Sequence, residues 1–153
     1  KMPVEELNRY QINEIIETSI NLIQYDKRAK NVSIIKKLSP SLPKVIIDGN
    51  QLSQVFINLT LNAIDAMSNG GTLTVRSTEI WGNIVIQFED TGIGITKEEL
   101  PKLFDPFYTT KEKGTGLGLA VSYNIIKKMN GTITVESEAG KGSIFTITIP
   151  YKE

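Results

Sequence analysis

Apolar residues recur at helical spacing in three parts of the chain. Isoleucines at every third or fourth position predict an amphipathic helix from about Gln11 to Lys30. A longer and more apolar helix is expected from about Gln51 to Met67, where Ser68-Asn69-Gly70-Gly71 ends it. A third helix is expected from Leu117 to Met129, with lysines in its last turn and Asn130-Gly131 as its stop.

Shorter stretches, rich in β-branched residues and bounded by Gly, Pro, Asn or Asp, predict strands. The predicted strands cover residues 32–38, 45–47, 72–79, 83–89, 132–137 and 143–149. A glycine-bearing turn at 90–95 leads into a capping box, Thr96-Lys97-Glu98-Glu99, which predicts a short helix, and a long loop is expected from Pro101 to Thr115. Helices and mainly antiparallel strands in one chain predict the α+β class, with a sheet covered on one face by helices.

Composition narrows the possible chemistry. The chain has 153 residues, with 17 Lys and Arg against 17 Asp and Glu, and it contains no Cys and no His. A disulfide framework, a cysteine nucleophile, a Ser-His-Asp triad and a zinc site of the usual ligands are therefore excluded. Charge balance argues against nucleic acid or an anionic membrane as the main partner, and no apolar run approaches the roughly 20 residues of a membrane span. The length favours a single domain over residues 1–153.

The second helix carries a narrow polar stripe on an otherwise apolar surface. The stripe consists of Gln51, Gln54, Asn58, Asn62 and Asp65, spaced by three or four residues. Such a stripe can be the solvated edge of a buried helix, but solvent-facing positions usually take Lys, Glu or Arg, and Asn is a mediocre helix former. Two Asn residues one turn apart therefore favour amides aimed at a ligand, and an amide oxygen suits Mg²⁺.

Two glycine-bearing segments could approach a ligand closely. In the first, Asp90 ends a strand and is followed by Gly92 and Gly94, which could be a plain turn or a carboxylate beside backbone that only Gly can bring near a ligand. The second has three alternating glycines that open a helix, where N–H groups and the dipole favour phosphate, although a flexible hinge would also need them. It lacks the Lys-Ser/Thr ending of a Walker loop and does not fit the Rossmann spacing.

The long loop before this helix holds an aromatic cluster and a lysine. Phe104, Phe107 and Tyr108 could form a hydrophobic plug, and Lys111 could be a solvated charge. A long loop with an aromatic anchor, followed by a glycine hinge, also has what a nucleotide lid needs.

Four segments, in this order along the chain, resemble the motif boxes of sensor histidine kinases. They are the N box Asn58-Leu59-Thr60-Leu61-Asn62-Ala63, the G1 box Asp90-Thr91-Gly92-Ile93-Gly94, the F box Phe104-Asp105-Pro106-Phe107 and the G2 box Gly114-Thr115-Gly116-Leu117-Gly118-Leu119. Four boxes in order are highly specific, and the flanking elements also fit. The resemblance implies the Bergerat (GHKL) fold, an α/β sandwich with a mixed, mainly antiparallel sheet, helices on one face and ATP between the helices and a lid.

Matching positions imply the residues of an ATP site. Asn62 would ligate Mg²⁺ that bridges the phosphates, and Asn58 would support it one turn earlier, through the phosphates or the waters of the metal. Asp90 would accept a hydrogen bond from the adenine amine. Lys111 would reach phosphate from the lid and would complete the implied catalytic set of Asn58, Asn62 and Lys111. The other implied ATP contacts are Gly92, Gly94, Ile95, Gly114, Thr115, Gly116, Leu117, Gly118, Leu119 and Thr146.

The chain departs from the family pattern at two places. Many relatives carry a Lys-Tyr pair just after the N box, where this chain has Asp65 and Ala66, as in the branch of the nitrogen-regulation kinases. This departure shifts the expected phosphate contact to Lys111. GHKL proteins that hydrolyse ATP or phosphorylate serine place a Glu general base where this chain has Asn58, and an amide cannot take a proton from water at neutral pH.

The resemblance therefore implies the catalytic domain of a histidine kinase, which presents the γ-phosphate of Mg·ATP to a histidine on a separate dimerisation domain. That domain and, through the full-length kinase, a response regulator are the implied partners. The implied parent is a homodimer, and the fragment is expected to be monomeric and cytoplasmic, with no nucleic acid or membrane contact. A GHKL conformational ATPase, an anti-sigma serine kinase and a nucleotide-sensing module remain alternatives.

Overall fold

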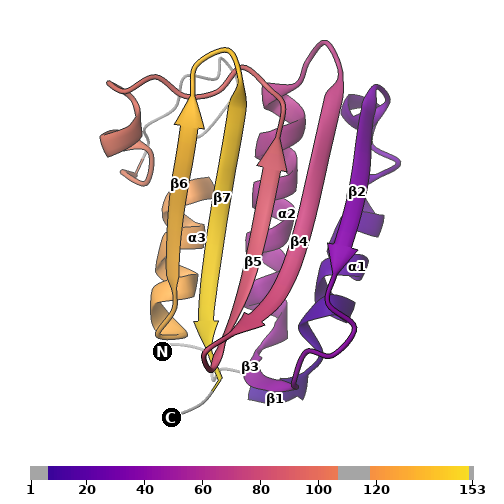
Figure 1. Ribbon diagram of the computed structural model, residues 1–153, viewed down its shortest axis with the longest axis vertical. Helices are drawn as coiled ribbons and strands as arrows, with labels where there is room; N and C mark the ends of the chain where they lie inside the picture. Colours follow the sequence, from indigo (N-terminus) through magenta and orange to yellow (C-terminus); the bar gives the residue numbers. More distant parts are fainter. Residues whose placement is uncertain (1–6, 107–117, 152–153) are drawn as a thin grey trace, which may run out of the picture.

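A five-stranded sheet forms one layer of the molecule (Figure 1). The structure, a computed structural model, describes residues 7–106 and 118–151. The strand order is β2-β4-β5-β7-β6, and only the β2–β4 pair is parallel. The strands are β2 Val32–Leu38, β4 Gly71–Ile80, β5 Asn83–Asp90, β6 Thr132–Glu138 and β7 Gly142–Pro150. The predicted mixed, mainly antiparallel sheet is thus confirmed.

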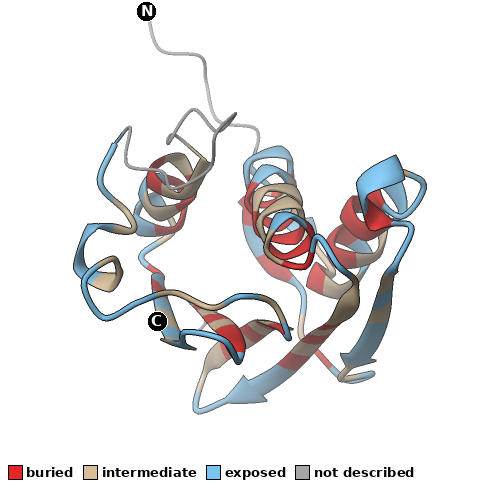
Figure 2. Cartoon of the chain, turned by 90° about the horizontal axis from the view of Figure 1, so that it is seen from above, coloured by how far each residue is buried: buried red, intermediate tan, exposed pale blue. Residues whose placement is uncertain are grey.

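Three helices form the second layer, all on the same face of the sheet (Figures 1 and 2). They are α1 Ile12–Ile23, α2 Gly49–Ala66 and α3 Gly118–Lys128, and α2 packs between the other two. Asp48 caps α2 by accepting hydrogen bonds from the main-chain N–H groups of Asn50 and Gln51. The predicted α+β class with helices on one face is therefore confirmed.

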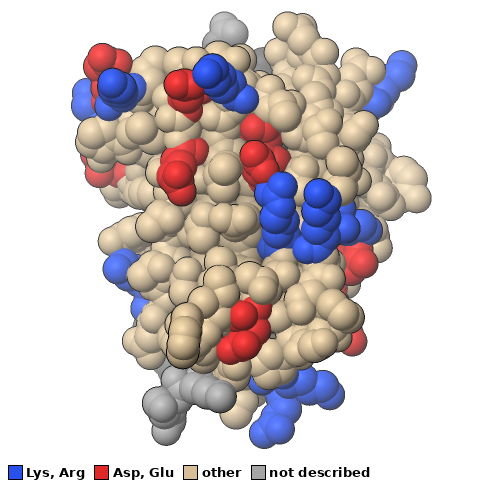
Figure 3. All heavy atoms as spheres, in the orientation of Figure 1, with Lys and Arg blue, Asp and Glu red and all other residues tan. Residues whose placement is uncertain are grey.

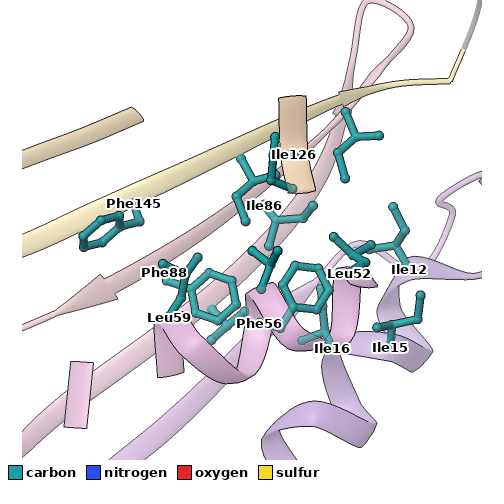
Figure 4. Packing of buried hydrophobic residues seen from close by; sticks show 14 of the residues in the cluster. Ile12, Ile15, Ile16, Leu52, Phe56, Leu59, Ile86, Phe88, Ile126 and Phe145 are labelled. Carbon is teal, nitrogen blue, oxygen red and sulfur yellow. The ribbon is translucent and has the colours of Figure 1, made fainter. Parts of the chain in front are cut away.

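The core lies between these two layers. In β5 every second residue from Ile84 to Asp90 is buried toward the helices, as the sequence alternation predicted. Phe56 of α2 meets Phe88 of β5 with ring centroids 5.7 Å apart, and both side chains are almost fully buried (Figure 4). Burial of each such side chain stabilises the fold by roughly 1.5–3 kcal/mol, so this seam fixes α2 over β5.

Three local predictions differ from the structure. The first helix ends at Ile23 rather than near Lys30, because Asp26 accepts a hydrogen bond from the main chain of Arg28 and caps a separate 3₁₀ turn, η1 Lys27–Ala29. A strand that the sequence pattern did not indicate, β1 Leu7–Tyr10, pairs with β3 Val45–Asp48.

The capping box at Thr96 forms as predicted, with Thr96 and Glu99 exchanging side-chain to main-chain hydrogen bonds. It opens a turn that leads into a 3₁₀ helix, η2 Leu100–Lys102, rather than an α-helix, and Pro101 lies within η2. The capping chemistry is therefore correct and the helix type is not.

The face of the sheet away from the helices is open and carries charges of both signs (Figure 3). Among them Arg76 of β4 pairs with Glu89 of β5 at 2.6 Å. No helix within residues 7–106 and 118–151 is long and apolar enough to cross a membrane. The side chains that the sequence singles out for chemistry lie mainly on the other side of the sheet, the side that carries the helices, near the end of β5.

Candidate ATP site

Asp90, the last residue of β5, is a buried carboxylate with only 6% of its surface exposed. Main-chain N–H groups hold it on two sides: Gly92 donates to Oδ1 at 2.9 Å, and Ser143 on the neighbouring strand donates as well. Burial raises the pKa of Asp90 above its ordinary value, and the two N–H donors oppose that shift. The fold therefore keeps a fixed, partly desolvated acceptor at the end of the central strands.

The turn after Asp90 is tied to two neighbouring segments. Ile93 donates its N–H to the carbonyl of Ala66 in the last turn of α2 at 3.0 Å, and its own carbonyl accepts from Gly140 at 2.6 Å. A Cβ on Gly92 would collide with the carbonyl oxygen of Ala66, and one on Gly94, whose φ is +73°, would collide with the carbonyl of residue 138. These glycines are therefore required by close approach to the protein's own backbone.

Asn58 and Asn62 lie on the predicted polar stripe of α2, and the opposite face of the helix, with Phe56 and Leu59, is buried. Asn58 is half-buried, and its Nδ2 donates to the carbonyl of Gly118 at 3.2 Å and to Oγ of Ser122 at 3.3 Å, both in the first turns of α3. Asn62 lies one turn further along and is also half-buried. The stripe therefore faces α3 at Asn58 and continues toward the end of α2 beside the Asp90 turn.

Asp65 is exposed at the end of the stripe. Arg28 approaches it from the turn after α1, with Nη1 3.6 Å from Oδ1 of Asp65. Arg28 also forms a two-pronged pair with Asp26, through Nε at 3.1 Å and Nη2 at 3.0 Å. A fixed cation thus adjoins the acidic residue at this end of α2.

The structure brings only part of the implied site together. Asp90, Gly92, Gly94 and Ile95 lie at one end of the sheet, and Asn58 is bonded to Gly118 at the start of α3. Leu119 packs against the core from the first turn of α3. Lys111, Gly114, Thr115, Gly116 and Leu117 lie outside the described residues.

Thr146 lies away from Asp90. Along β7 the buried side chains of Phe145 and Ile147 face the helices, so Thr146 between them points to the open face of the sheet. There its Oγ1 accepts a hydrogen bond from Gln87 at 3.4 Å. The structure therefore gives Thr146 no place beside Asp90.

The comparisons with known proteins agree with this geometry. Residues 47–153 match the sequence model of the "Histidine kinase-, DNA gyrase B-, and HSP90-like ATPase" family. The chain belongs to this ATPase family. It is 31% identical to the catalytic domain of the histidine kinase ThkA, with a TM-score of 0.86 over 95% of this chain and 96% of that one.

Curated relatives of the ATPase domain are sensor kinases. The chain is 42% identical to sporulation kinase E of Bacillus subtilis over 93% of its own length and 19% of that protein. It is 38% identical to the sensor histidine kinase ZraS of Escherichia coli, over 94% of its own length and 31% of that protein. The chain therefore spans about a fifth to a third of these relatives.

Three serines of the ATPase domain escaped the sequence reasoning. Ser143 supports Asp90, Ser122 contacts Asn58, and Ser137 accepts a hydrogen bond from the N–H of Ile95 at 2.7 Å while donating to the carbonyl of Gly142 at 2.8 Å. Ser143 acts on Asp90 through its main-chain N–H, so its side-chain type carries no signal, and no signal within α3 distinguishes Ser122.

The donor set of the ATPase domain suits Mg²⁺ held mainly by its nucleotide. Within the described residues, no group of three or more Asp, Glu, His or Cys could hold a metal by itself. The stripe instead offers amide oxygens, and Mg²⁺ commonly takes one or two protein ligands and keeps waters and phosphates for the rest. Asn62 would hold the Mg²⁺ ion, as the resemblance of the N box to the histidine kinase motif implies.

Proposed function

We propose that this domain binds Mg·ATP and donates the γ-phosphate to a histidine on a separate dimerisation domain in two-component signalling. The observation that carries the proposal is Asn58, an amide anchored to α3 where ATP-hydrolysing relatives place a glutamate base. The amide of Asn58 cannot activate water or serine as a base, so the domain suits a nucleophile that needs no deprotonation. Neutral imidazole is such a nucleophile.

Different residues bind the adenine base, the metal ion and the phosphates. Asp90 accepts a hydrogen bond from the adenine amine, a role suited to a carboxylate that two N–H groups already hold in place. Asn62 ligates Mg²⁺, whose charge would offset that of the phosphates. Lys111 and the main chain of residues 114–119 contact the phosphates from the lid. Phosphoryl transfer needs positioning and charge neutralisation more than covalent help, so this set is sufficient.

The partners follow from the same function. The histidine belongs to a dimerisation domain of the same parent kinase, which we infer to be a homodimer that works in the cytoplasm, with this domain monomeric by itself. A solved structure pairs ThkA with the response regulator TrrA, and our chain is 27% identical to that kinase with a TM-score of 0.81. A response regulator is therefore the expected final phosphate acceptor.

The direct test is phosphate transfer in trans. The domain is mixed with the His-bearing dimerisation domain of its parent kinase and labelled Mg·ATP, and label is expected on the histidine and not on this chain. The domain alone should hydrolyse ATP very slowly. Brisk steady-state hydrolysis would instead support a conformational ATPase, and nucleotide binding without transfer would support a nucleotide-sensing module.

Asn62→Ala should remove Mg-dependent ATP binding and transfer while leaving the far-ultraviolet circular dichroism spectrum unchanged. Asn50→Ala is the control, because Asn50 is an exposed residue of the same helix that lies in its first turn, about three turns before Asn62. Equal affinity of the Asn62→Ala variant and the wild type for Mg·ATP would exclude Asn62 as the metal ligand.

A further inference from the structure

The amide of Asn58 is held from one side by the first turns of α3. Its Nδ2 lies 3.2 Å from the carbonyl oxygen of Gly118 and 3.3 Å from Oγ of Ser122. Ser122 is fully buried, and its Oγ donates to the same Gly118 carbonyl at 2.9 Å. The three groups form a closed set of hydrogen bonds between α2 and α3.

The chemistry of this set permits only one orientation of the amide. A main-chain carbonyl can only accept, and Ser122 uses its single hydroxyl hydrogen on Gly118, so both groups present lone pairs to Asn58. Only the NH₂ end of the amide can face two acceptors. Because the amide is planar, Oδ1 points away from these two partners.

We propose that Ser122 is a positioning residue, which fixes the Asn58 amide so that Oδ1 is the atom offered to bound Mg·ATP. This inference rests on the proposed function and narrows it. Phosphate oxygens only accept hydrogen bonds and would repel Oδ1, whereas a water on the metal donates. Asn58 therefore acts on the hydration shell of the metal and not on the phosphates.

A purely structural role for Ser122 would leave Asn58 unaffected. Buried helical serines commonly bond the carbonyl four residues back, and Ser19 of α1 does so to Ile15 at 2.7 Å while also fully buried. Ser19→Ala is therefore a matched control: the same substitution, burial and back-bond, with no contact to Asn58. Alanine is a strong helix former, so both variants are expected to fold.

The first test uses the nucleotide-free domain. The side-chain NH₂ signals of Asn58, assigned in nitrogen–proton spectra by their loss in Asn58→Ala, should exchange with solvent about fivefold faster in Ser122→Ala than in the wild type, since one neutral hydrogen bond is lost. Ser19→Ala should leave these signals unchanged. Unchanged exchange in Ser122→Ala, or an equal change in both serine variants, would overturn the proposal.

The second test separates metal from phosphate. Binding of a fluorescent ATP analogue is titrated with Mg²⁺, and Ser122→Ala should need about fivefold more Mg²⁺ for half-saturation while keeping its affinity for the metal-free analogue. Adding Ser122→Ala to Asn58→Ala should change nothing further. Equal weakening with and without Mg²⁺ would refute the metal role, and no binding by the wild type would instead refute the proposed function.

Discussion

The G1 turn makes a quantitative prediction at Gly94, where two separate costs of a side chain coincide. Its φ of +73° disfavours an L-residue, and an added Cβ would collide with the carbonyl oxygen of residue 138 and lie 2.8 Å from the carbonyl carbon. These obstacles are backbone atoms and cannot rotate aside. The left-handed backbone costs about 1–2 kcal/mol and overpacking about 1–3 kcal/mol. Gly94→Ala should therefore lower the free energy of unfolding by roughly 2–5 kcal/mol.

Gly140 provides the control that separates the two costs. Its φ is +85°, but a Cβ there would meet nothing within 4 Å. Gly140→Ala should therefore show only the backbone cost of about 1–2 kcal/mol. The difference between the two variants measures the collision of residue 94 with the β6–β7 turn.

Urea unfolding followed by far-ultraviolet circular dichroism is the suitable assay. The single tryptophan, Trp81, is 95% exposed in the folded state, so its emission would report little of the transition. With a slope near 2 kcal/mol per molar urea, the midpoint should fall by roughly 1–2.5 M in Gly94→Ala and by roughly 0.5–1 M in Gly140→Ala. Equal shifts in both variants would refute the packing argument.

Three further substitutions test the electrostatics and hydrogen bonds around the site. Burial raises the pKa of Asp90, so its contribution to stability is present below the ordinary pKa of 3.8 and is lost as pH rises through the raised value. In urea unfolding, Asp90→Asn should therefore gain stability relative to the wild type as the pH is raised from acid to neutral. A difference in unfolding free energy between the two proteins that stays constant with pH would contradict this. Arg28 holds the pKa of Asp26 at about 2, and Arg28→Ala should return it toward 3.8 in a carboxyl-carbon NMR titration, whereas an unchanged value would exclude Arg28 as the cause. Ser137→Ala leaves the N–H of Ile95 without its acceptor and should cost about 1–3 kcal/mol in thermal or urea unfolding, and no measurable loss would show that another acceptor takes its place.

The long helix α2 could be predicted well because one periodicity sets both its buried faces and its polar stripe. The apolar positions set the buried faces, and the remaining positions form the polar stripe, in which Asn58 and Asn62 are half-buried while Gln51, Gln54 and Asp65 are exposed. Asp90 was also predictable as a strand-end carboxylate. Its burial and its support by Ser143 depend on β7, which is more than fifty residues away in the chain, and local sequence carries no such information.

The misplaced elements have physical causes of the same kind. β1, with the sequence Leu-Asn-Arg-Tyr, has little apolar alternation and is a strand only because β3 pairs with it. Thr146, in contrast, could have been placed from local sequence. The alternation of Phe145 and Ile147 with threonines already puts Thr146 on the face of the sheet away from the helices. The sequence contained that information, and the resemblance to a family was less reliable than strand parity at this position.

The strand order has a consequence for how the domain folds. β7 lies between β5 and β6, so until residues 142–150 have arrived, β5 is an edge strand with one unpaired side. Its face carries Ile84, Ile86 and Phe88, apolar side chains that invite association with other chains when exposed. Asp90 also gains its second N–H donor only at that moment. During synthesis this domain should therefore acquire nucleotide binding only after β7 has been made, and nascent or truncated chains lacking β7 should be the species that need chaperones.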